Sequence, residues 1–380
     1  MKHIVVQLKV IYAHEGESVY DRFFLDHLSE QFETFFLTFN RNPNAILNYK
    51  RTIIMPDFGK PFRIREGVRA LISVPIRVLI FRDYLHKLKP DILVGNWIWR
   101  YGLYSALSGF RPFILFVWGS DVLIIPNYSI LLRGLASYVL RKADLTLVDS
   151  DIQLEACIKL GVDREKIFKV PWFDVNDVTA ISKRYPDKHK IRKALGVGSR
   201  EFVIICTRRH EKVYDVETLV KAAPKILSKI KNTRFLLVGA GKLTNKLQRL
   251  VKEMSLEKHF IFLGQQPREN VIKYLMASDV YVSTSLSDGT SASLLEAMSC
   301  KIMPVVTSIP GNKEWIIDGE NGLLFPPMDF ELLADAVIKA LTSKDYRDKI
   351  AEKAYSVVVS RADWTKNSEH LEKAFLSLKK

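Results

Sequence analysis

The chain has 380 residues, a formal net charge of +15, 48% hydrophobic residues and 26% charged residues. This balance excludes a disordered chain, and the length exceeds what one hydrophobic core usually organises, so we expect two domains. Cys157, Cys206 and Cys300 are far apart and lack metal or redox spacing, which favours a reducing cytoplasm. No stretch reaches about 18 uninterrupted apolar residues, so no membrane span is predicted.

Short apolar runs alternate with helical patterns through the first half of the chain. The opening residues are typical of a first strand and not of a signal peptide. The pattern predicts strands at 4–10, 34–39, 91–94, 112–117 and 144–148. It predicts helices at 19–32 and at 67–88, with a break near Pro75. Such alternation is typical of a doubly wound α/β domain.

Residues 60–89 form the most basic segment, with eight Lys and Arg against Glu66 and Asp83. Residues 70–81 inside it are strongly apolar. A basic and apolar helix is suited to lie on an anionic membrane surface. The alternative is a core helix with a solvated charged rim, and the sequence leaves both interpretations open.

A domain boundary is predicted near residues 170–175, before a polar and basic stretch at 183–200. The strand pattern then restarts at 202–207, 234–239, 261–264, 280–283 and 303–306. Helices are predicted between these strands and at 313–317 and 331–341. We therefore expect an N-terminal Rossmann-like domain at 1–172, a C-terminal one at 173–360, and a final helix at 361–380 that packs back on the N-terminal domain.

The segment 282–298 is the most informative for function. A strand-like run ends at a polar loop with Asp288, Gly289, Thr290 and Ser291, and a helix with Glu296 follows. Backbone N–H groups at a helix start, together with the helix dipole, bind phosphate. The two carboxylates then suit sugar and ribose hydroxyls. In the alternative, Asp288 is an N-cap and Glu296 an ordinary helix residue.

Two further loops follow predicted strands of the second half. Arg208, Arg209 and Lys212 lie after the first of them and are suited to clamp a diphosphate and stabilise charge on a leaving group. Gly241 belongs to a Gly-Ala-Gly turn that lacks the third glycine of a dinucleotide motif. A tight turn is therefore the alternative to a phosphate contact at Gly241.

Loops after strands of the first half carry aromatic and small residues. We predict that an acceptor contacts Trp118, Asp121, Trp97 and Gly16. A tryptophan ring can stack on a sugar, and a carboxylate accepts hydrogen bonds from sugar hydroxyls or from the backbone. Core packing is the alternative for Trp118. Trp99 and Tyr101 follow the same strand as Trp97, and we predict that they line the same cleft.

These residues together resemble the retaining glycosyltransferases of family 4, which have the GT-B fold. The resemblance covers most of the chain and is strongest over 202–326. It rests on the acidic pair Asp288 and Glu296, which leads into Leu294-Leu295-Glu296-Ala297-Met298, and on five further motifs: Pro304-Val305-Val306, Pro310-Gly311-Asn312 with Glu314, Asn321-Gly322, Pro90-Asp91-Ile92 and Trp118-Gly119-Ser120-Asp121. The implied fold is α/β, with two Rossmann-like doubly wound domains that face a central cleft.

The resemblance also implies roles for individual positions. Asp288 would contact the donor sugar, Glu296 the ribose and Arg209 the phosphate, while residues 289–291 would offer amides to the sugar and diphosphate. The lysine expected five residues after Arg209 is Tyr214 here, and Trp118 replaces a histidine. Lys212 is a candidate substitute, two residues out of register.

The expected activity is transfer of a hexosyl unit, with retention, from a UDP- or GDP-type sugar to a glycan or lipid-linked acceptor. We expect no cofactor and no metal, and a cytoplasmic protein that contacts the inner face of an anionic membrane. The alternatives are a sugar phosphorylase of the same fold, or a protein that binds nucleotide or polyanion without catalysis. Nucleic acid is not an expected partner, because the basic residues are scattered and no nucleic-acid-binding motif occurs.

Overall fold

The computed structural model describes residues 8–16, 19–43, 49–57, 66–171 and 173–378. These residues form two compact units, Met1–Val170 with Thr365–Lys380, and Pro171–Trp364. The chain therefore passes between the units twice, close to the boundaries proposed from sequence at 172/173 and 360/361. Residues 4–7 of the predicted first strand and basic positions 60, 63 and 65 lie outside the described residues.

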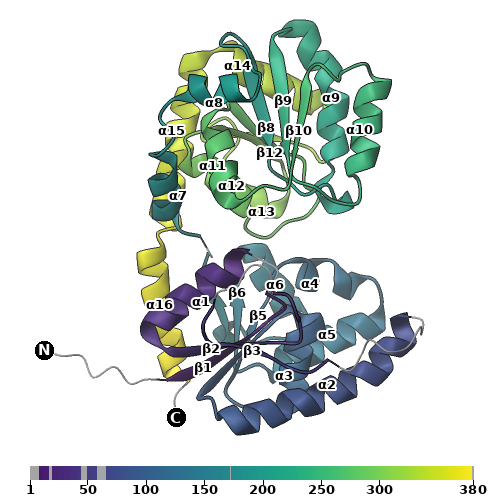
Figure 1. The fold of residues 1–380 in the computed structure, drawn as a ribbon, viewed down its shortest axis with the longest axis vertical. Helices are drawn as coiled ribbons and strands as arrows, with labels where there is room; N and C mark the ends of the chain where they lie inside the picture. The colour runs from purple at the N-terminus through teal and green to yellow at the C-terminus, as the bar shows by residue number, and fades with distance from the viewer. Residues whose placement is uncertain (1–7, 17–18, 44–48, 58–65, 172, 379–380) are drawn as a thin grey trace, which may run out of the picture. The chain divides into compact units, whose positions relative to one another are not determined.

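The first unit has a parallel sheet of seven strands in the order β3-β2-β1-β4-β5-β6-β7 (Figure 1). Its strands are β1 Lys9–Ala13, β2 Glu33–Thr38, β3 Thr52–Ile54, β4 Ile92–Asn96, β5 Phe113–Phe116, β6 Leu145–Val148 and β7 Ile167–Lys169. β4 and β5 are buried along their whole length because helices cover both faces of such a sheet. This explains why they appear in the sequence as continuous apolar runs.

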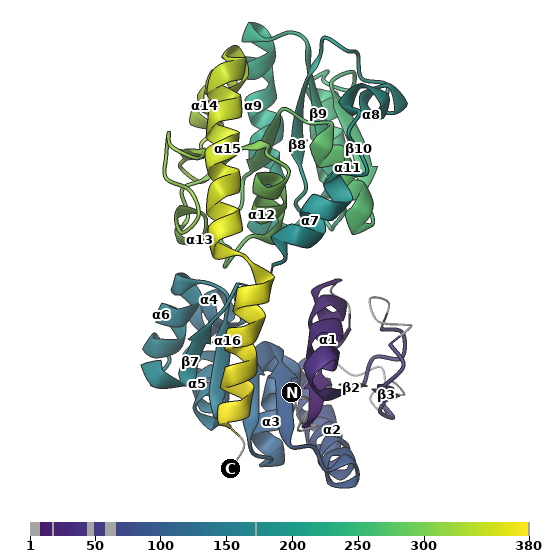
Figure 2. The same cartoon turned by 90° about the vertical axis from the view of Figure 1, so that its left-hand side faces the viewer.

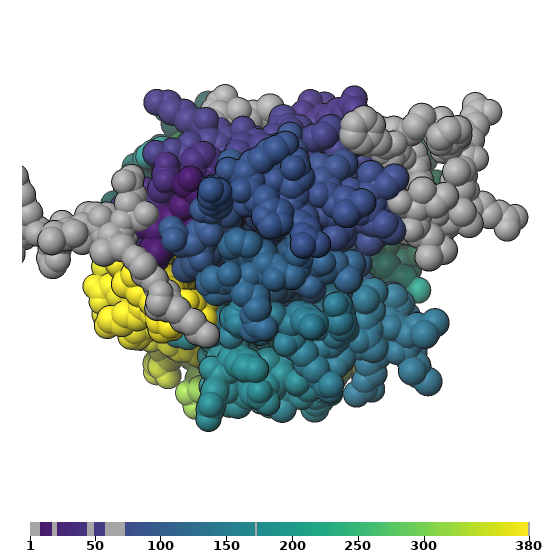
Figure 3. Space-filling view, turned by 90° about the horizontal axis from the view of Figure 1, so that it is seen from below, coloured from purple at the N-terminus to yellow at the C-terminus, as the bar shows by residue number. Residues whose placement is uncertain are grey.

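The helices of the first unit include α1 Val19–Gln31, α2 Glu66–Leu88, α3 Leu103–Ser108, α4 Ser120–Leu123, α5 Ile130–Lys142 and α6 Asp151–Lys159. The final helix, α16 Trp364–Ser377, also belongs to this unit from Thr365 onward. Its Phe375 ring stacks on Phe32 at 5.6 Å between ring centroids. Figures 2 and 3 show α16, in yellow, along the same unit as the purple N-terminal segments.

The second unit has a parallel sheet of six strands in the order β10-β9-β8-β11-β12-β13. Its strands are β8 Phe202–Cys206, β9 Thr233–Val238, β10 Phe260–Gly264, β11 Val280–Ser283, β12 Met303–Thr307 and β13 Leu323–Phe325. The helices around it are α7 Val175–Ser182, α8 Lys188–Ala194, α9 Val216–Lys229, α10 Thr244–Glu253, α11 Arg268–Met276, α12 Ala292–Ser299, α13 Pro310–Lys313, α14 Phe330–Thr342 and α15 Lys344–Arg361.

Both sheets are doubly wound, which confirms the predicted fold class of two Rossmann-like domains. In the first unit the strand order reverses between β1 and β4, and in the second it reverses between β8 and β11. Ligands of open parallel sheets bind outside the carboxyl ends of the strands at such a switch point. The loops after these four strands are therefore the places where sites are expected.

Two predicted helix boundaries are wrong. α2 is one helix through Pro75, with no break there. The helix expected at 313–317 is instead α13, which begins at Pro310 after the N-cap residue Ile309, and Glu314 is its C-cap. Proline suits the first helical position because its missing N–H would have no partner there. Glu314 therefore ends a helix, whereas the sequence predicted that it begins one.

Candidate functional site

Arg208 and Asp288 meet at the switch point of the second sheet. Arg208 follows β8 and Asp288 follows β11, and these two strands are neighbours. The Arg208 Nη2 atom donates to Asp288 Oδ2 at 2.5 Å, and the side chains are 8% and 20% exposed. An ion pair this well shielded holds both groups in fixed positions. The structure thus brings together two of the residues selected from sequence.

The Arg208 guanidinium has further partners besides Asp288. Its Nη1 atom donates to Ser291 Oγ at 2.9 Å and to Ser293 Oγ at 2.7 Å. The guanidinium also lies over the Tyr214 ring, 4.1 Å from the centroid. Burial acts to lower the pKa of the Arg208 guanidinium, but the Asp288 carboxylate, together with Tyr281, Tyr214 and Cys206, raises that pKa above its ordinary value. A permanent cation therefore lies beside Tyr214, the position at which the family pattern has lysine.

The loop after β11 is held by its own helix cap. Ser291 is the N-cap of α12, and its side chain accepts a hydrogen bond from the Leu294 N–H. The interpretation of Asp288 as the N-cap is therefore wrong, because Asp288 lies three residues before the cap. Asp288 therefore lies outside the helix that carries Glu296. Its carboxylate is instead positioned by Arg208.

Glu296 is buried on α12, only 6% exposed. It accepts a hydrogen bond at 3.2 Å from Arg268 Nε, at the start of α11, and Arg268 also pairs with Asp177 of α7. Burial raises the Glu296 pKa, and the charge of Arg268 opposes that rise. Arg268 was missed from the sequence, although its place just after a strand is the signal that could have identified it.

Gly311 marks the closest approach between two loops of this site. A Cβ atom on Gly311 would lie 2.3 Å from the Gly289 carbonyl oxygen and 2.6 Å from that of Asp288. Only glycine fits there without displacement of the Asp288 loop. The start of α13 is therefore packed directly against the backbone of residues 288 and 289.

We expect Gly311→Ala to weaken nucleotide-sugar binding, because the added methyl group must push the Asp288–Gly289 backbone away. The measurement is the dissociation constant by calorimetry, with an expected rise of about tenfold. Gly134→Ala is the matched control, since its Cβ meets nothing within 4 Å. Equal affinities of the two variants would contradict this role of Gly311.

Gly241 lies in a tight turn after β9, packed against the residues that follow Arg208. Its Cβ would be 2.4 Å from the His210 carbonyl oxygen. The Gly241 N–H donates to Thr244 Oγ1 at 3.0 Å, and His210 Nδ1 contacts that oxygen at 2.9 Å. Burial lowers the His210 pKa. The turn interpretation is therefore what the structure displays, and a phosphate contact by Gly241 stays a prediction.

Arg209 and Lys212, the other predicted clamp residues, are exposed. Within the described part of the chain neither has an ion pair, in contrast to the buried Arg208. Both lie on the loop after β8, where Lys212 begins a short 3-10 turn that ends at Tyr214. They are thus free cations at the carboxyl edge of the second sheet.

In the first unit, Trp118 stacks on His14. Their ring centroids are 5.1 Å apart and the rings are nearly parallel at 6°. The indole Nε1 donates to Asn96 Oδ1 at 3.2 Å, and His14 Nδ1 lies 2.5 Å from the buried Asp21 carboxylate. The loops after β1, β4 and β5 are therefore joined by side chains. Asp21 was not singled out from the sequence.

Asp121 has no exposed surface. Its oxygens accept hydrogen bonds from the backbone N–H groups of Trp118 at 2.9 Å and Ile98 at 3.3 Å. Of the two roles predicted for it, the structure displays the backbone acceptor, which ties the loop after β5 to the loop after β4. Burial raises its pKa from 3.8 to about 6, although these N–H donors act in the opposite direction.

This raised pKa has a measurable consequence. A carboxyl group with a higher pKa in the folded than in the unfolded chain binds more protons when folded, so its contribution to stability falls as pH rises between about 4 and 6. The shift of about two units corresponds to roughly 3 kcal/mol. In urea titrations, the wild-type advantage over Asp121→Asn should shrink over this range. An advantage independent of pH would contradict the assignment.

Three further residues of the first unit, Trp97, Gly16 and Tyr101, were predicted to lie at the acceptor cleft. An acceptor contact of Trp97 or Gly16 stays a prediction. Trp97 is half-buried with a φ of 63°, and Gly16 is buried with a φ of 72°, a conformation that glycine adopts readily. Tyr101 is wrong as a cleft residue, because it is fully buried and its hydroxyl accepts a hydrogen bond from the Phe39 N–H at 2.8 Å. The Tyr101 hydroxyl thus gives the Phe39 N–H, just after β2, a hydrogen-bond partner in place of a backbone carbonyl.

Within the described ranges, no group of three or more histidine, cysteine, aspartate or glutamate side chains is arranged to hold a metal ion. A search of the same residues found no helix with the length and apolar character needed to cross a bilayer.

Comparison with known families gives two matches. The profile of the glycosyl transferases group 1 matches residues 187–357, and that of the glycosyl transferase 4-like proteins matches residues 62–150. The two matches thus fall in different units of the structure. Arg208, Asp288 and Glu296 all lie within the first match.

The chain is also similar to curated proteins of two bacteria. N-acetyl-alpha-D-glucosaminyl L-malate synthase of Bacillus anthracis is 28% identical over 57% of this chain and 60% of its own length. The putative teichuronic acid biosynthesis glycosyltransferase TuaC of Bacillus subtilis is 24% identical over 87% of this chain and 86% of its own. The match thus spans less than two thirds of the first of these relatives.

Solved structures share the fold. HepE of Anabaena, crystallised with UDP and glucose, has a TM-score of 0.79 at 19% identity and covers 98% of this chain and 100% of its own. Sucrose-phosphate synthase of Thermosynechococcus elongatus has a TM-score of 0.82 at 19% identity, with 98% and 99% covered. At this level of identity the likeness establishes the architecture of two Rossmann-like domains.

Proposed function

Because the chain belongs to the GT-B glycosyltransferases related to family 4, we propose that it moves a hexosyl unit from a nucleotide-diphosphate sugar to a hydroxyl acceptor, with retention of anomeric configuration. The donor is a UDP- or GDP-type sugar. HepE, a structural neighbour, was crystallised with UDP-glucose, which supports the UDP type.

The single observation that carries this proposal is the buried Arg208–Asp288 pair at the switch point of the second sheet. It combines a fixed carboxylate with a fixed cation where parallel sheets bind nucleotides. Asp288 uses Oδ2 for Arg208, so Oδ1 is available to accept hydrogen bonds from sugar hydroxyls. A site that bound only anions would gain nothing from a carboxylate beside its buried arginine.

The donor would extend from Asp288 along α12. Its sugar hydroxyls would bind Asp288, its diphosphate the amides of residues 289–291 at the start of α12, and its ribose hydroxyls Glu296. Arg208, Arg209 and Lys212 would balance the charge of the departing diphosphate, together with the positive end of the helix dipole. We propose that no metal is required, because these cations perform that role.

The transfer step needs no protein base in this proposal. The bond between the anomeric carbon and the diphosphate oxygen breaks, and the acceptor oxygen bonds to the same face of that carbon. The acceptor proton passes to the leaving phosphate oxygen. Closure of the site around the donor would exclude water and so limit hydrolysis.

We further propose a glycan or lipid-linked acceptor and peripheral contact with an anionic membrane. The net charge of +15 supports attraction to anionic headgroups. Exposed Ile76 and Leu79 on α2, at 43% and 67%, add an apolar surface within the basic segment. A relative is named a GDP-mannose-dependent phosphatidylinositol monomannoside mannosyltransferase, which is consistent with such an acceptor.

Proton NMR of the product tests the reaction type. Purified protein with a nucleotide-sugar and an acceptor extract should yield a new glycoside with the anomeric configuration of the donor. An inverted product would contradict the proposed mechanism. Phosphate-dependent release of a sugar 1-phosphate would identify the phosphorylase alternative, and donor binding without turnover would identify the binding-only alternative.

A further inference from the structure

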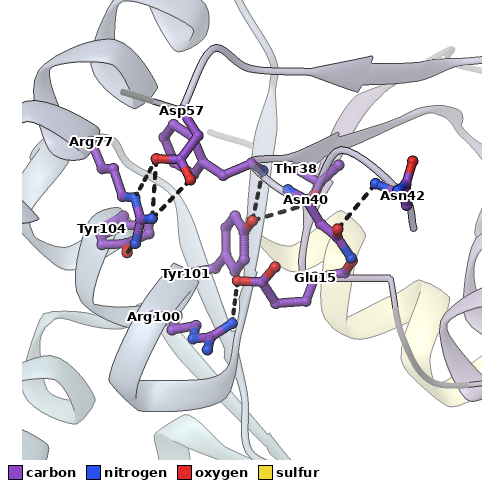
Figure 4. Close-up of polar contacts among 10 residues, drawn as sticks. Glu15, Thr38, Asn40, Asn42, Asp57, Arg77, Arg100, Tyr101 and Tyr104 are labelled. Carbon is purple, nitrogen blue, oxygen red and sulfur yellow. Dashed lines mark hydrogen bonds and ion pairs between the residues drawn. The ribbon is translucent and has the colours of Figure 1, made fainter. Parts of the chain in front are cut away.

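A pocket of about 250 Å³ opens at the carboxyl edge of the first sheet. Loops after three adjacent strands contribute to it: Glu15 follows β1, Asn40 to Asn42 follow β2, and Asp57 follows β3. Arg77 of α2 and Arg100, after β4, close its other side. Figure 4 shows Glu15, Asn40, Asn42, Asp57, Arg77 and Arg100 around Tyr101 and Tyr104. The pocket lies within one unit, next to the switch point between β1 and β4.

One side of the pocket is rigid. Arg77 contacts Asp57 through Nε at 3.2 Å and through Nη2 at 3.1 and 3.0 Å. Its Nη1 atom donates to the Tyr104 hydroxyl at 3.3 Å, and the guanidinium lies 5.7 Å from the centroid of the Phe39 ring. The Asp57 side chain is only 12% exposed. This pair anchors α2 to the loop after β3 and neutralises the Asp57 charge.

The other side carries the cationic excess. Arg100 Nη1 contacts Glu15 Oε1 at 2.5 Å, which neutralises the second carboxylate. Arg41 has no ion pair or hydrogen bond from its side chain to any described residue, and the side-chain amide of Asn42 is likewise unused there. Three arginines thus face two carboxylates, each already paired. A free guanidinium and a free amide remain to bind a ligand.

Asn40 holds this arrangement in place. Its Nδ2 atom donates to the Glu15 carbonyl oxygen at 2.9 Å, and its Oδ1 accepts from the Asn42 N–H at 3.1 Å. The loops after β1 and β2 are therefore cross-linked at the pocket, so Arg41 and Asn42 are presented from an ordered turn. Positioning of this kind lowers the cost of binding.

We propose that this pocket binds the acceptor, and that the acceptor is a sugar or polyol that carries an anionic group, either phosphate or carboxylate. The inference rests on the proposed function. Arginine is the side chain suited to such oxyanions because its planar fork matches their geometry. A volume of about 250 Å³ is large enough for one sugar or polyol unit.

Calorimetry with matched pairs of small molecules tests the charge requirement. Glucose 6-phosphate and glucuronate are expected to bind the full chain at least tenfold more tightly than glucose. Arg41→Ala should reduce this preference at least tenfold. Arg133→Ala, which removes an equally exposed arginine of α5 in the same unit, is the control and should leave the preference unchanged.

Three outcomes would overturn the inference: equal binding of glucose and glucose 6-phosphate, no effect of Arg41→Ala, or an equal effect of Arg133→Ala. Vesicles that contain phosphatidylinositol form a parallel arm. Binding that depends on Arg41 in vesicles as well as in solution identifies a lipid-borne phosphate, and binding in solution alone identifies a free one.

The same samples are titrated with nucleotide-sugars. Donor binding without selective binding of the anionic sugars rejects the acceptor pocket and leaves the proposed function standing. Selective binding of the anionic sugars without any donor binding rejects the transferase proposal and leaves an oxyanion site.

Discussion

Arg208→Ala should lower the turnover number by about 10²- to 10³-fold, the effect of removing one fixed group that stabilises transition-state charge. The substitution also leaves Asp288 without its partner, so the carboxylate that is proposed to hold the sugar loses its fixed position. Steady-state kinetics with a saturating nucleotide-sugar measures the effect. Arg208→Lys should restore part of the activity, because lysine keeps the charge but not the two-sided contact.

Stability must be measured alongside this activity. Breaking a buried ion pair by removing one partner costs about 3–5 kcal/mol, so the alanine variant is expected to melt earlier. Arg200→Ala is the control, since Arg200 is exposed and precedes β8 at the opposite edge of the sheet. A folded Arg208→Ala variant with wild-type turnover would exclude Arg208 from the site.

Glu296→Gln should weaken nucleotide-sugar binding by about tenfold to a hundredfold. The loss of hydrogen bonds from ribose hydroxyls to a charged acceptor corresponds to roughly 1.5–3 kcal/mol. Glutamine keeps the shape of the buried side chain, and Arg268 keeps its pairing with Asp177, so the fold should persist. Equilibrium binding by calorimetry is the direct measurement.

The control for this variant is Glu253→Gln, at an exposed position at the end of α10. It removes the same charge without a change at the site. If Glu296→Gln bound the donor with wild-type affinity, the ribose assignment would be wrong and Glu296 would serve only to hold Arg268.

Periodicity and strand-like runs predicted the longer strands of both sheets because parallel strands are buried on both faces and stand out in the sequence. The three-residue edge strands β3, β7 and β13 were not predicted, because runs this short give no clear pattern. The start of α13 was misplaced because Pro310 was not recognised as a first helical residue. The role of Asp288 also depended on a residue far away in the sequence. Ser291 caps α12, and the Asp288 carboxylate is instead held by Arg208, 80 residues away. A contact between residues this far apart cannot be predicted from the spacing of residues within one motif.

The residues of the candidate site could also be predicted only in part. Loops at strand ends could be selected because the fold places them at one edge, and Arg208 and Asp288 were selected in this way. Glu296 was selected from the helix that follows the Asp288 loop. Within such a loop, burial decides which residue points inward, and Arg208 is buried while its neighbour Arg209 is exposed. The pairing of Arg268 with Glu296, and that of Arg77 with Asp57, required the tertiary structure because the two residues of each pair are far apart in the sequence and share no local motif.

Thermal unfolding with a panel of UDP-, GDP-, ADP-, CDP- and dTDP-sugars tests the central claim most directly, with Asp288→Ala and Glu296→Ala beside the wild type. A donor at 100 times its dissociation constant stabilises the fold by about 2.7 kcal/mol, a readily measured shift. We expect a shift with the UDP- or GDP-sugar that is lost or strongly reduced in both variants. The absence of a shift with every nucleotide-sugar, or a shift that both variants retain, would contradict this claim.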